Sequence, residues 1–256
     1  MIFKTRPGIK KQFDTMHDFG IKNLIVSGCS FTYNNHETSA VAWPYYLKDI
    51  GGFDQVLDCS MPGAGNYHIA NSLQWAMELA NPDPNDSLII VMWSGNDRDD
   101  YICPKTKINN YPFKFNYSDN VATGITGGSH DNASGNTNNK EITVLGKTKT
   151  LESRAIENYL IISSLYNFLQ NKDYKFIFLD YIDRTLPSRT EDFEIRQYLP
   201  ADTSNNLDRM VTKIMTPHNW ATKYNLLMDD DFHPSPDGHL NWSQKVLLPK
   251  LQTIIT

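Results

Sequence analysis

Four short segments of the chain carry the side chains that acyl-transfer chemistry needs. They are Ser27–Thr32, which contains Ser30, the glycine-rich Ser60–Asn66, the segment Ser94–Arg98, and the acidic segment Asp229–Pro234. Together they supply a hydroxyl, glycines, an amide and a carboxylate–imidazole pair. These groups match a nucleophile, oxyanion donors, a general base and a group that orients the base. The chemistry that they could perform together is therefore the cleavage or transfer of an acyl group.

Each of these segments follows an apolar run that predicts a buried β-strand. Continuous β-branched and aromatic runs, without alternation, are typical of parallel strands covered on both faces. Because sites in open parallel sheets lie outside the carboxyl ends of the strands, we expect the four segments to meet at one edge. The predicted strands are residues 23–27, 55–58, 87–93 and 174–180, with a short fifth strand at 224–228.

Apolar residues spaced three and four positions apart predict helices between these strands. A weaker helix over residues 41–50 tolerates Pro44 only in its first turn, and Pro249 predicts a kink in a C-terminal helix over 236–254. Alternating strands and helices favour an α/β fold with a parallel sheet of about five strands, right-handed crossovers and helices on both faces. The clearest helical repeats are Ile69, Leu73, Ala76 and Ala80, and then Ala155, Tyr159, Ile162, Tyr166 and Leu169.

Composition narrows the class of protein. The 256 residues, 40% of them hydrophobic, are enough for one α/β domain spanning 1–256. A net charge of −5 disfavours a general nucleic-acid binder, because phosphate neutralisation needs a basic surface. No apolar run approaches the roughly 20 residues that span a bilayer. The first 20 residues hold no signal-peptide core, so we expect a cytoplasmic protein or one released by lysis, such as a phage product.

Residues 104–149 interrupt the strand–helix pattern. Their dense Asn, Gly, Ser and Thr predict turns and an irregular insertion, and 184–205 is a second loop-like stretch. Aromatic residues at the start of the insertion could form a sugar-stacking platform, although their near alternation fits an ordinary β-hairpin equally well. These residues are Tyr101, Tyr111, Phe113, Phe115 and Tyr117.

The four chemical segments, taken in order, resemble the sequence blocks of SGNH (GDSL-like) hydrolases. The nucleophile block carries Cys29 where many members have Asp, and the third block lacks the spacer residue of the family pattern. The insertion lies outside the resemblance. The matching blocks are Gly28–Thr32, followed by Trp43–Leu47, then Pro62–Asn66, Gly95–Asp97, and Asp230–Pro234 with Gly238 and His239.

The resemblance implies a role for each residue and a flavodoxin-like α/β/α fold. Ser30 would be the nucleophile, His233 its general base, and Asp230 the carboxylate that orients the imidazole. The backbone N–H groups of Ser30 and Gly63 and the side-chain amide of Asn96 would form the oxyanion hole. No metal or organic cofactor is implied. The expected substrates are small acyl esters, in particular O-acetyl esters of carbohydrates, which the polar, aromatic insertion also favours.

Other functions remain open on the same residues. An O-acyltransferase would replace water by a sugar hydroxyl, and a thioesterase would use the same site. A non-catalytic carbohydrate-binding or structural module on this fold is the alternative of another class. The complete set of Ser30, Gly63, Asn96, Asp230 and His233 argues against that module.

Several residues also have a purely structural interpretation. Ser30 could cap a following helix, and Asp231 is the fallback for Asp230. Cys29 could be a thiol nucleophile, but a small buried residue is the favoured interpretation. Asn66 is equally compatible with a helix cap and with an amide lining the site. The remaining structural expectations concern Cys59 and Cys103 as free thiols, Asp97, an Arg98 ion pair with Asp97 or Asp99, and His239.

Overall fold

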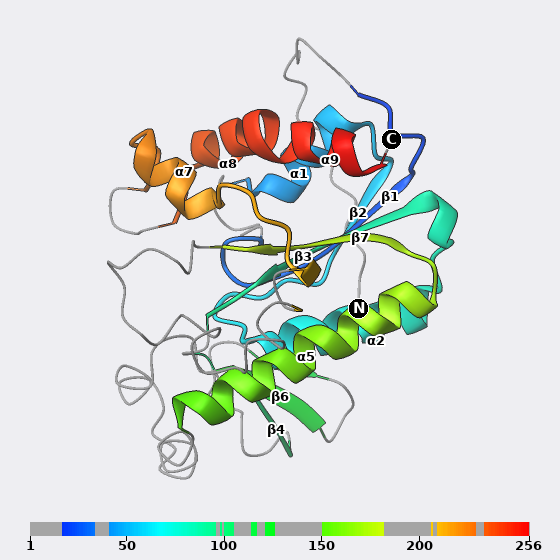
Figure 1. The fold of residues 1–256 in the computed structure, drawn as a ribbon, viewed down its shortest axis with the longest axis vertical. Coiled ribbons are helices and arrows are strands. Elements are labelled where there is room, and N and C mark those ends of the chain that lie inside the picture. The colour runs from blue at the N-terminus through cyan, green and yellow to red at the C-terminus, as the bar shows by residue number, and fades with distance from the viewer. Residues whose placement is uncertain are drawn as a thin grey trace.

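The protein, seen in a computed structural model, is built around a parallel sheet in the order β2-β1-β3-β7 (Figure 1). All seven residues of β3 are buried, as expected of an inner strand between two others. The strands are β1 (Asn23–Ser27), β2 (Gln55–Asp58), β3 (Ser87–Trp93) and β7 (Lys175–Asp180). The structure describes residues 17–33, 41–95, 98, 100–104, 114–116, 121–125, 150–181, 206, 209–228 and 233–255, and only the backbone of 101–104, 114–116, 121–125, 151 and 152.

Helices cover both faces of this sheet, so the predicted three-layer α/β architecture is confirmed. Figure 1 shows α2 and α5 on one face and α1, α7, α8 and α9 on the other. Their bounds are α1 (Trp43–Gly51), α2 (Asn66–Ala80), α5 (Leu151–Asn171), α7 (Pro217–Lys223), α8 (Pro236–Trp242) and α9 (Leu248–Ile255). In the part of the chain that the structure describes, no helix has the length and apolar character that a membrane span requires.

Local sequence signals set where these helices begin and bend. Thr150, Thr216 and Ser235 precede α5, α7 and α8, and each side chain accepts a hydrogen bond from a backbone N–H in the first turn. A π-helical turn over Ser243–Leu247 lies directly between α8 and α9, just before Pro249, where the sequence predicts a kink. A wider turn there accommodates the proline ring, which would clash with a carbonyl of a regular α-helix.

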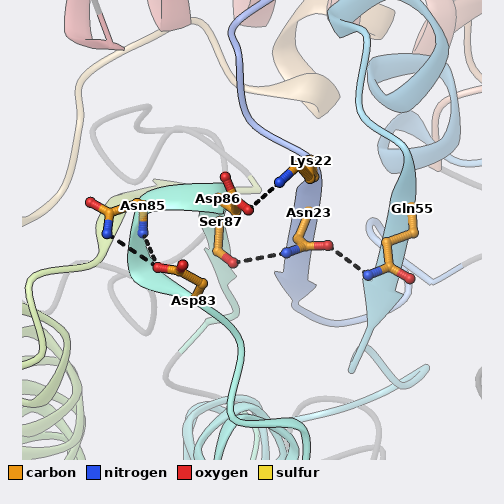
Figure 2. Close-up of polar contacts among 7 residues, drawn as sticks. All are labelled: Lys22, Asn23, Gln55, Asp83, Asn85, Asp86 and Ser87. Carbon is orange, nitrogen blue, oxygen red and sulfur yellow. Dashed lines mark hydrogen bonds and ion pairs between the residues drawn. The ribbon is translucent and has the colours of Figure 1, made fainter.

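Polar side chains join three strands at their amino ends (Figure 2). Asn23 on β1 donates from Nδ2 to Ser87 Oγ on β3 over 3.2 Å, and its Oδ1 accepts from Gln55 Nε2 on β2 over 2.6 Å. Lys22 and Asp86 form an ion pair of 2.5 Å beside them. The side chains at the amino ends of the strands therefore have a structural role, and the candidate site is sought at the carboxyl ends.

The prediction of a strand at 224–228 is wrong. Helix α7 ends at Lys223, and Asn225 adopts a left-handed φ of 54°, which breaks an extended strand. Within the described residues, the outer side of β7 is instead bridged at one residue, Val211, whose partner is Phe178. In the described part of the chain, the parallel sheet thus has four strands and this single bridge.

The predicted irregular insertion also contains regular structure. A second, antiparallel sheet in the order β4-β6-β5 is formed by β4 (Asp100–Pro104), β5 (Lys114–Asn116) and β6 (Val121–Ile125). Phe115 lies in β5, which pairs with β6 as in the hairpin interpretation, and Tyr101 lies in β4. The loop-like stretch 184–205 and the other three aromatic residues fall outside the described residues.

Candidate active site

Ser30 and His233 lie together although 203 positions separate them in the sequence. The Oγ atom of Ser30 is 2.6 Å from the Nε2 atom of His233, and both side chains are partly buried. This distance is within hydrogen-bond reach, as required of a nucleophile and its general base. The first and last of the four chemical segments therefore meet, as the sequence predicts.

A tight turn after β1 presents the Ser30 hydroxyl. The N–H groups of Thr32 and Tyr33 both donate to the carbonyl of Cys29, over 2.9 and 3.0 Å. Gly28 allows this turn to form, because a Cβ at that position would lie 2.2 Å from Thr32 Oγ1 and 3.2 Å from the Met92 carbonyl oxygen. The backbone at Gly28 is thus packed closely against both the Thr32 side chain and the end of β3.

The chain around His233 is held by pairing of the residues that flank the acidic segment. Leu227 and Pro234 form an antiparallel bridge, and the N–H of Met228 donates to the carbonyl of His233 over 3.0 Å. The second imidazole nitrogen, Nδ1, is buried. It is the atom to which an orienting carboxylate would bind.

An aromatic cluster also restrains the imidazole, and sequence reasoning did not assign it a role. The Phe31 ring is fully buried, and its centroid is 4.5 Å from that of His233 at an interplanar angle of 35°. Tyr181 is the residue after β7, and its ring centroid lies 4.6 Å from that of Phe31. The ring centroid of His218 lies 6.2 Å from that of Phe31. The signal that could have found Phe31 is its place directly after Ser30.

The glycine-rich segment runs beside the Ser30 turn. The N–H of Met61 donates to the carbonyl of Gly28 over 3.1 Å, and Ala64 donates to Met61 over 3.2 Å to close a β-turn. Proline at the second position of this turn and Gly63 at the third, with a φ of 75°, are the signature of a type II turn. The hydrogen bond that closes the turn does not use the N–H of Gly63, which is the donor that the sequence predicts.

Asn66 neither caps a helix nor lines the site as an open amide. It is the first residue of α2, and the N-cap position is Gly65, which has no side chain of its own to cap the helix. The Asn66 amide is buried and pairs with the backbone of Ser94, after β3, and with the side chain of Asn158 on α5. Its role is thus to join three elements.

Asp100 supplies the missing cap of α2, a role that sequence reasoning did not find. Its two carboxylate oxygens accept from the N–H groups of Gly65, over 2.8 Å, and His68, over 2.7 Å. A carboxylate at this end also interacts favourably with the helix dipole. Arg98 contacts the same region, since Nη1 donates to the Ala64 carbonyl over 3.4 Å and the guanidinium carbon lies 5.7 Å from the Tyr181 ring centroid.

The remaining thiols and histidines near this edge are buried. Cys29 and Cys59 are free thiols, and burial raises the pKa of the Cys59 thiol well above its ordinary value. Burial lowers the pKa of His68 to about 4, and burial together with the nearby His233 lowers the pKa of His239 to about 3. Cys29 therefore has the buried position expected of it, whereas the neighbouring hydroxyl faces His233.

Several predicted residues fall outside the described part of the chain. They are Asn96, Asp97, Asp99, Asp230 and Asp231, and the side chain of Cys103 is not described either. Their roles stay predictions. Among the described residues, no three His, Cys, Asp or Glu side chains are grouped as metal ligands.

Solved structures similar to this chain include bacterial esterases and lipases at low sequence identity. The esterase EstA from Pseudoalteromonas sp. has a TM-score of 0.49 and 12% identity, over 90% of this chain and 99% of its own. A GDSL-like lipase from Bacteroides thetaiotaomicron has a TM-score of 0.46 and 12% identity, over 91% and 88% of the two chains.

The YXIM protein from Bacillus subtilis is matched at a TM-score of 0.49 and 14% identity, over 91% of this chain, which spans only 56% of that protein. No protein-family model matches the sequence, and neither does any curated protein. The resemblance of this chain to the SGNH (GDSL-like) hydrolases rests on its sequence blocks.

Proposed function

We propose that this protein is a serine ester hydrolase that uses Ser30 as its nucleophile. The observation that carries the proposal is the 2.6 Å contact between Ser30 Oγ and His233 Nε2. A serine hydroxyl is a weak nucleophile until a base accepts its proton, and an imidazole at this distance can do so. Two neighbouring features support the proposal. The hydrogen-bonded turn holds Ser30 in place, and the Phe31 ring packs against the imidazole of His233.

The reaction proceeds in two acyl-transfer steps. Ser30 Oγ attacks the ester carbonyl carbon while its proton passes to Nε2 of His233, which gives a tetrahedral oxyanion and an imidazolium. Collapse of this intermediate breaks the bond to the alcohol oxygen, and that oxygen takes the proton from His233. A water molecule then attacks the acyl-serine, its proton passes to His233, and the acid leaves while Ser30 regains the proton.

Asp230 is proposed as the carboxylate that accepts from Nδ1 of His233. It lies three residues before His233 in the sequence, and the buried position of Nδ1 favours a partner from the protein over bulk water. A carboxylate there holds the imidazole in the tautomer that leaves Nε2 free to accept a proton.

The oxyanion is proposed to be bound by the N–H groups of Ser30 and Gly63 and by the Asn96 amide. The type II turn at Gly63 supports this assignment, because its N–H is not used by the hydrogen bond of the turn. Each such donor is typically worth about 100- to 1000-fold in turnover.

The proposed substrates are small acyl esters, with O-acetyl groups of carbohydrates as the first class to test. Acyl transfer to a sugar hydroxyl and thioester hydrolysis would use the same residues. Acceptor competition distinguishes acyl transfer from hydrolysis, since a transferase forms a new ester as the sugar alcohol concentration rises. Thioester hydrolysis is distinguished by measuring the turnover rates on an oxygen ester and on the matched thioester side by side.

Labelling with a fluorophosphonate, read by intact mass, tests the nucleophile. We expect one adduct on the wild type and on the matched control Cys29→Ala, and none on Ser30→Ala. These three proteins and His233→Ala are then assayed on p-nitrophenyl acetate, where Ser30→Ala and His233→Ala should lose turnover by up to about a millionfold. A folded Ser30→Ala protein with full ester turnover would refute the mechanism.

The carboxylate is tested by comparing Asp230→Ala with its neighbour Asp231→Ala. We expect Asp230→Ala to reduce turnover by less than the serine and histidine substitutions do, because the imidazole can still act as a base without its orienting group. Asp231→Ala should leave turnover close to the wild-type value. The reverse order of effects would move the orienting role to Asp231.

A further inference from the structure

The Asn66 amide uses all of its hydrogen-bonding capacity inside the protein. Its Nδ2 donates to the Ser94 carbonyl over 3.1 Å and to Asn158 Oδ1 over 2.6 Å. Its Oδ1 accepts from the Ser94 N–H over 2.8 Å and from the Ser94 hydroxyl over 3.2 Å. A primary amide offers two donors and two acceptor sites, so no other side chain of this size satisfies all four contacts.

These contacts join the two segments from which the proposed oxyanion donors come. Asn66 ends the glycine-rich segment three residues after Gly63, and Ser94 precedes Asn96 by two residues. The pairing of the amide with both backbone groups of Ser94 resembles the exchange of hydrogen bonds between neighbouring strands. Asn66, Ser94 and Asn158 are 2%, 0% and 7% exposed, so these bonds are shielded from bulk water.

We propose that Asn66 is a positioning residue that fixes the glycine-rich segment and the segment after β3 relative to each other, and with them the oxyanion donors. The proposal rests on the proposed ester hydrolysis. Asn158 supports the amide from α5, and its own Nδ2 is held by the Arg154 carbonyl over 2.9 Å. A change at Asn66 should therefore act on the transition state, where charge develops, and much less on substrate binding.

The opposite edge of the sheet offers a matched control. Asn23 also joins neighbouring segments through both atoms of its amide, but it does so at the amino ends of the strands (Figure 2). A merely structural role for Asn66 predicts that Asn23→Ala and Asn66→Ala have the same effect on turnover at equal loss of thermal stability. A positioning role predicts that only the change at Asn66 lowers kcat.

The experiment measures kcat and KM on p-nitrophenyl acetate, melting temperature, and hydrogen exchange of peptides that contain Ser94. The proteins are the wild type, Asn66→Ala, Asn66→Asp, Asn158→Leu and Asn23→Ala. Asn66→Asp keeps the size and the acceptor atoms but loses both donated bonds, so it tests the contacts even if Asn66→Ala fails to fold. Asn158→Leu removes only the support from α5 and leaves both backbone bonds to Ser94.

We expect kcat to fall on the order of 100-fold in Asn66→Asp, because a misplacement of about 1 Å has an effect of this size. KM should change little, exchange at Ser94 should rise, and Asn158→Leu should show a smaller loss of kcat. Asn23→Ala should keep the wild-type kcat. Unchanged exchange at Ser94, or a kcat that follows melting temperature alone across all variants, would overturn the positioning role.

Failure of the proposed function is recognised separately and earlier. A wild-type protein without Ser30-dependent turnover on any ester would refute both proposals before an Asn66 variant is made. Wild-type turnover that needs Ser30 but is unaffected by Asn66→Asp would refute the positioning role alone.

Discussion

Replacement of Gly28 by alanine should damage the site more than the fold. A Cβ at this position would lie 2.2 Å from Thr32 Oγ1, 2.8 Å from Thr32 Cβ and 3.2 Å from the Met92 carbonyl oxygen. The first two distances are shorter than contacts that real Cβ atoms make, so Thr32 and the turn that carries Ser30 must shift. Overpacking of this kind typically costs about 1–3 kcal/mol of unfolding free energy.

The effect on catalysis follows from the position of Ser30 in the same turn. Its Oγ lies 2.6 Å from His233 Nε2, and a shift of about 1 Å from that geometry can cost about 100-fold in turnover. We therefore expect Gly28→Ala to lower kcat/KM for p-nitrophenyl acetate about 100-fold. The accompanying loss in melting temperature should be about 2–4 °C for each kcal/mol, as in chains of this size.

Two further variants separate the local clash from general destabilisation. Gly20→Ala places a side chain at a left-handed φ of 64° with no atom within 4 Å, so it should lower stability while leaving kcat/KM unchanged. Adding Thr32→Gly to Gly28→Ala removes the two closest atoms and should restore part of the activity, with Thr32→Gly alone as the reference for the cycle. Wild-type kcat/KM in Gly28→Ala, at the same melting temperature as Gly20→Ala, would refute this reasoning.

Three further predictions concern residues around the site. Phe31→Leu should lower unfolding free energy by about 1–2 kcal/mol in urea titration, because a fully buried ring is replaced by a smaller side chain. It should also reduce kcat because the His233 ring loses its aromatic neighbour, and an unchanged kcat would show that this ring does not restrain the imidazole. Asp100→Ala should cost about 0.5–2 kcal/mol through loss of the α2 cap, and equal urea midpoints for this variant and the wild type would contradict that role. The pKa values of His68 and His239 are lowered to about 4 and 3 in the folded protein, so the unfolded chain binds more protons below about pH 6.5 and stability falls as pH decreases. At pH 5 each histidine should contribute about 2 kcal/mol to this loss, and a His239→Gln protein whose stability falls from pH 7.5 to 5 as steeply as that of the wild type would exclude its share.

Strands and helices followed closely from local patterns. The bounds predicted for β1, β2 and β3 are those observed, because continuous apolar runs identify strands buried on both faces. The run at 224–228 misled the prediction, since its apolar residues follow a helix end and a left-handed Asn225. The strands within 104–149 were missed because they are short, with 3 residues in β5 and 5 in β6, and lie in a stretch whose Asn, Gly, Ser and Thr favour turns.

By itself, the sequence determined which chemical groups are present, their order along the chain and the strands after which they come. The reason is that side-chain types are read directly from the sequence, and the periodicity that predicts a strand or a helix depends only on residues close together in the chain. Only the tertiary structure decided that Ser30 and His233 approach to 2.6 Å, that Phe31 packs on the imidazole, and that the Asn66 amide binds the backbone of Ser94. These contacts join segments far apart in the chain, and their geometry depends on how the helices pack on the sheet rather than on any local pattern.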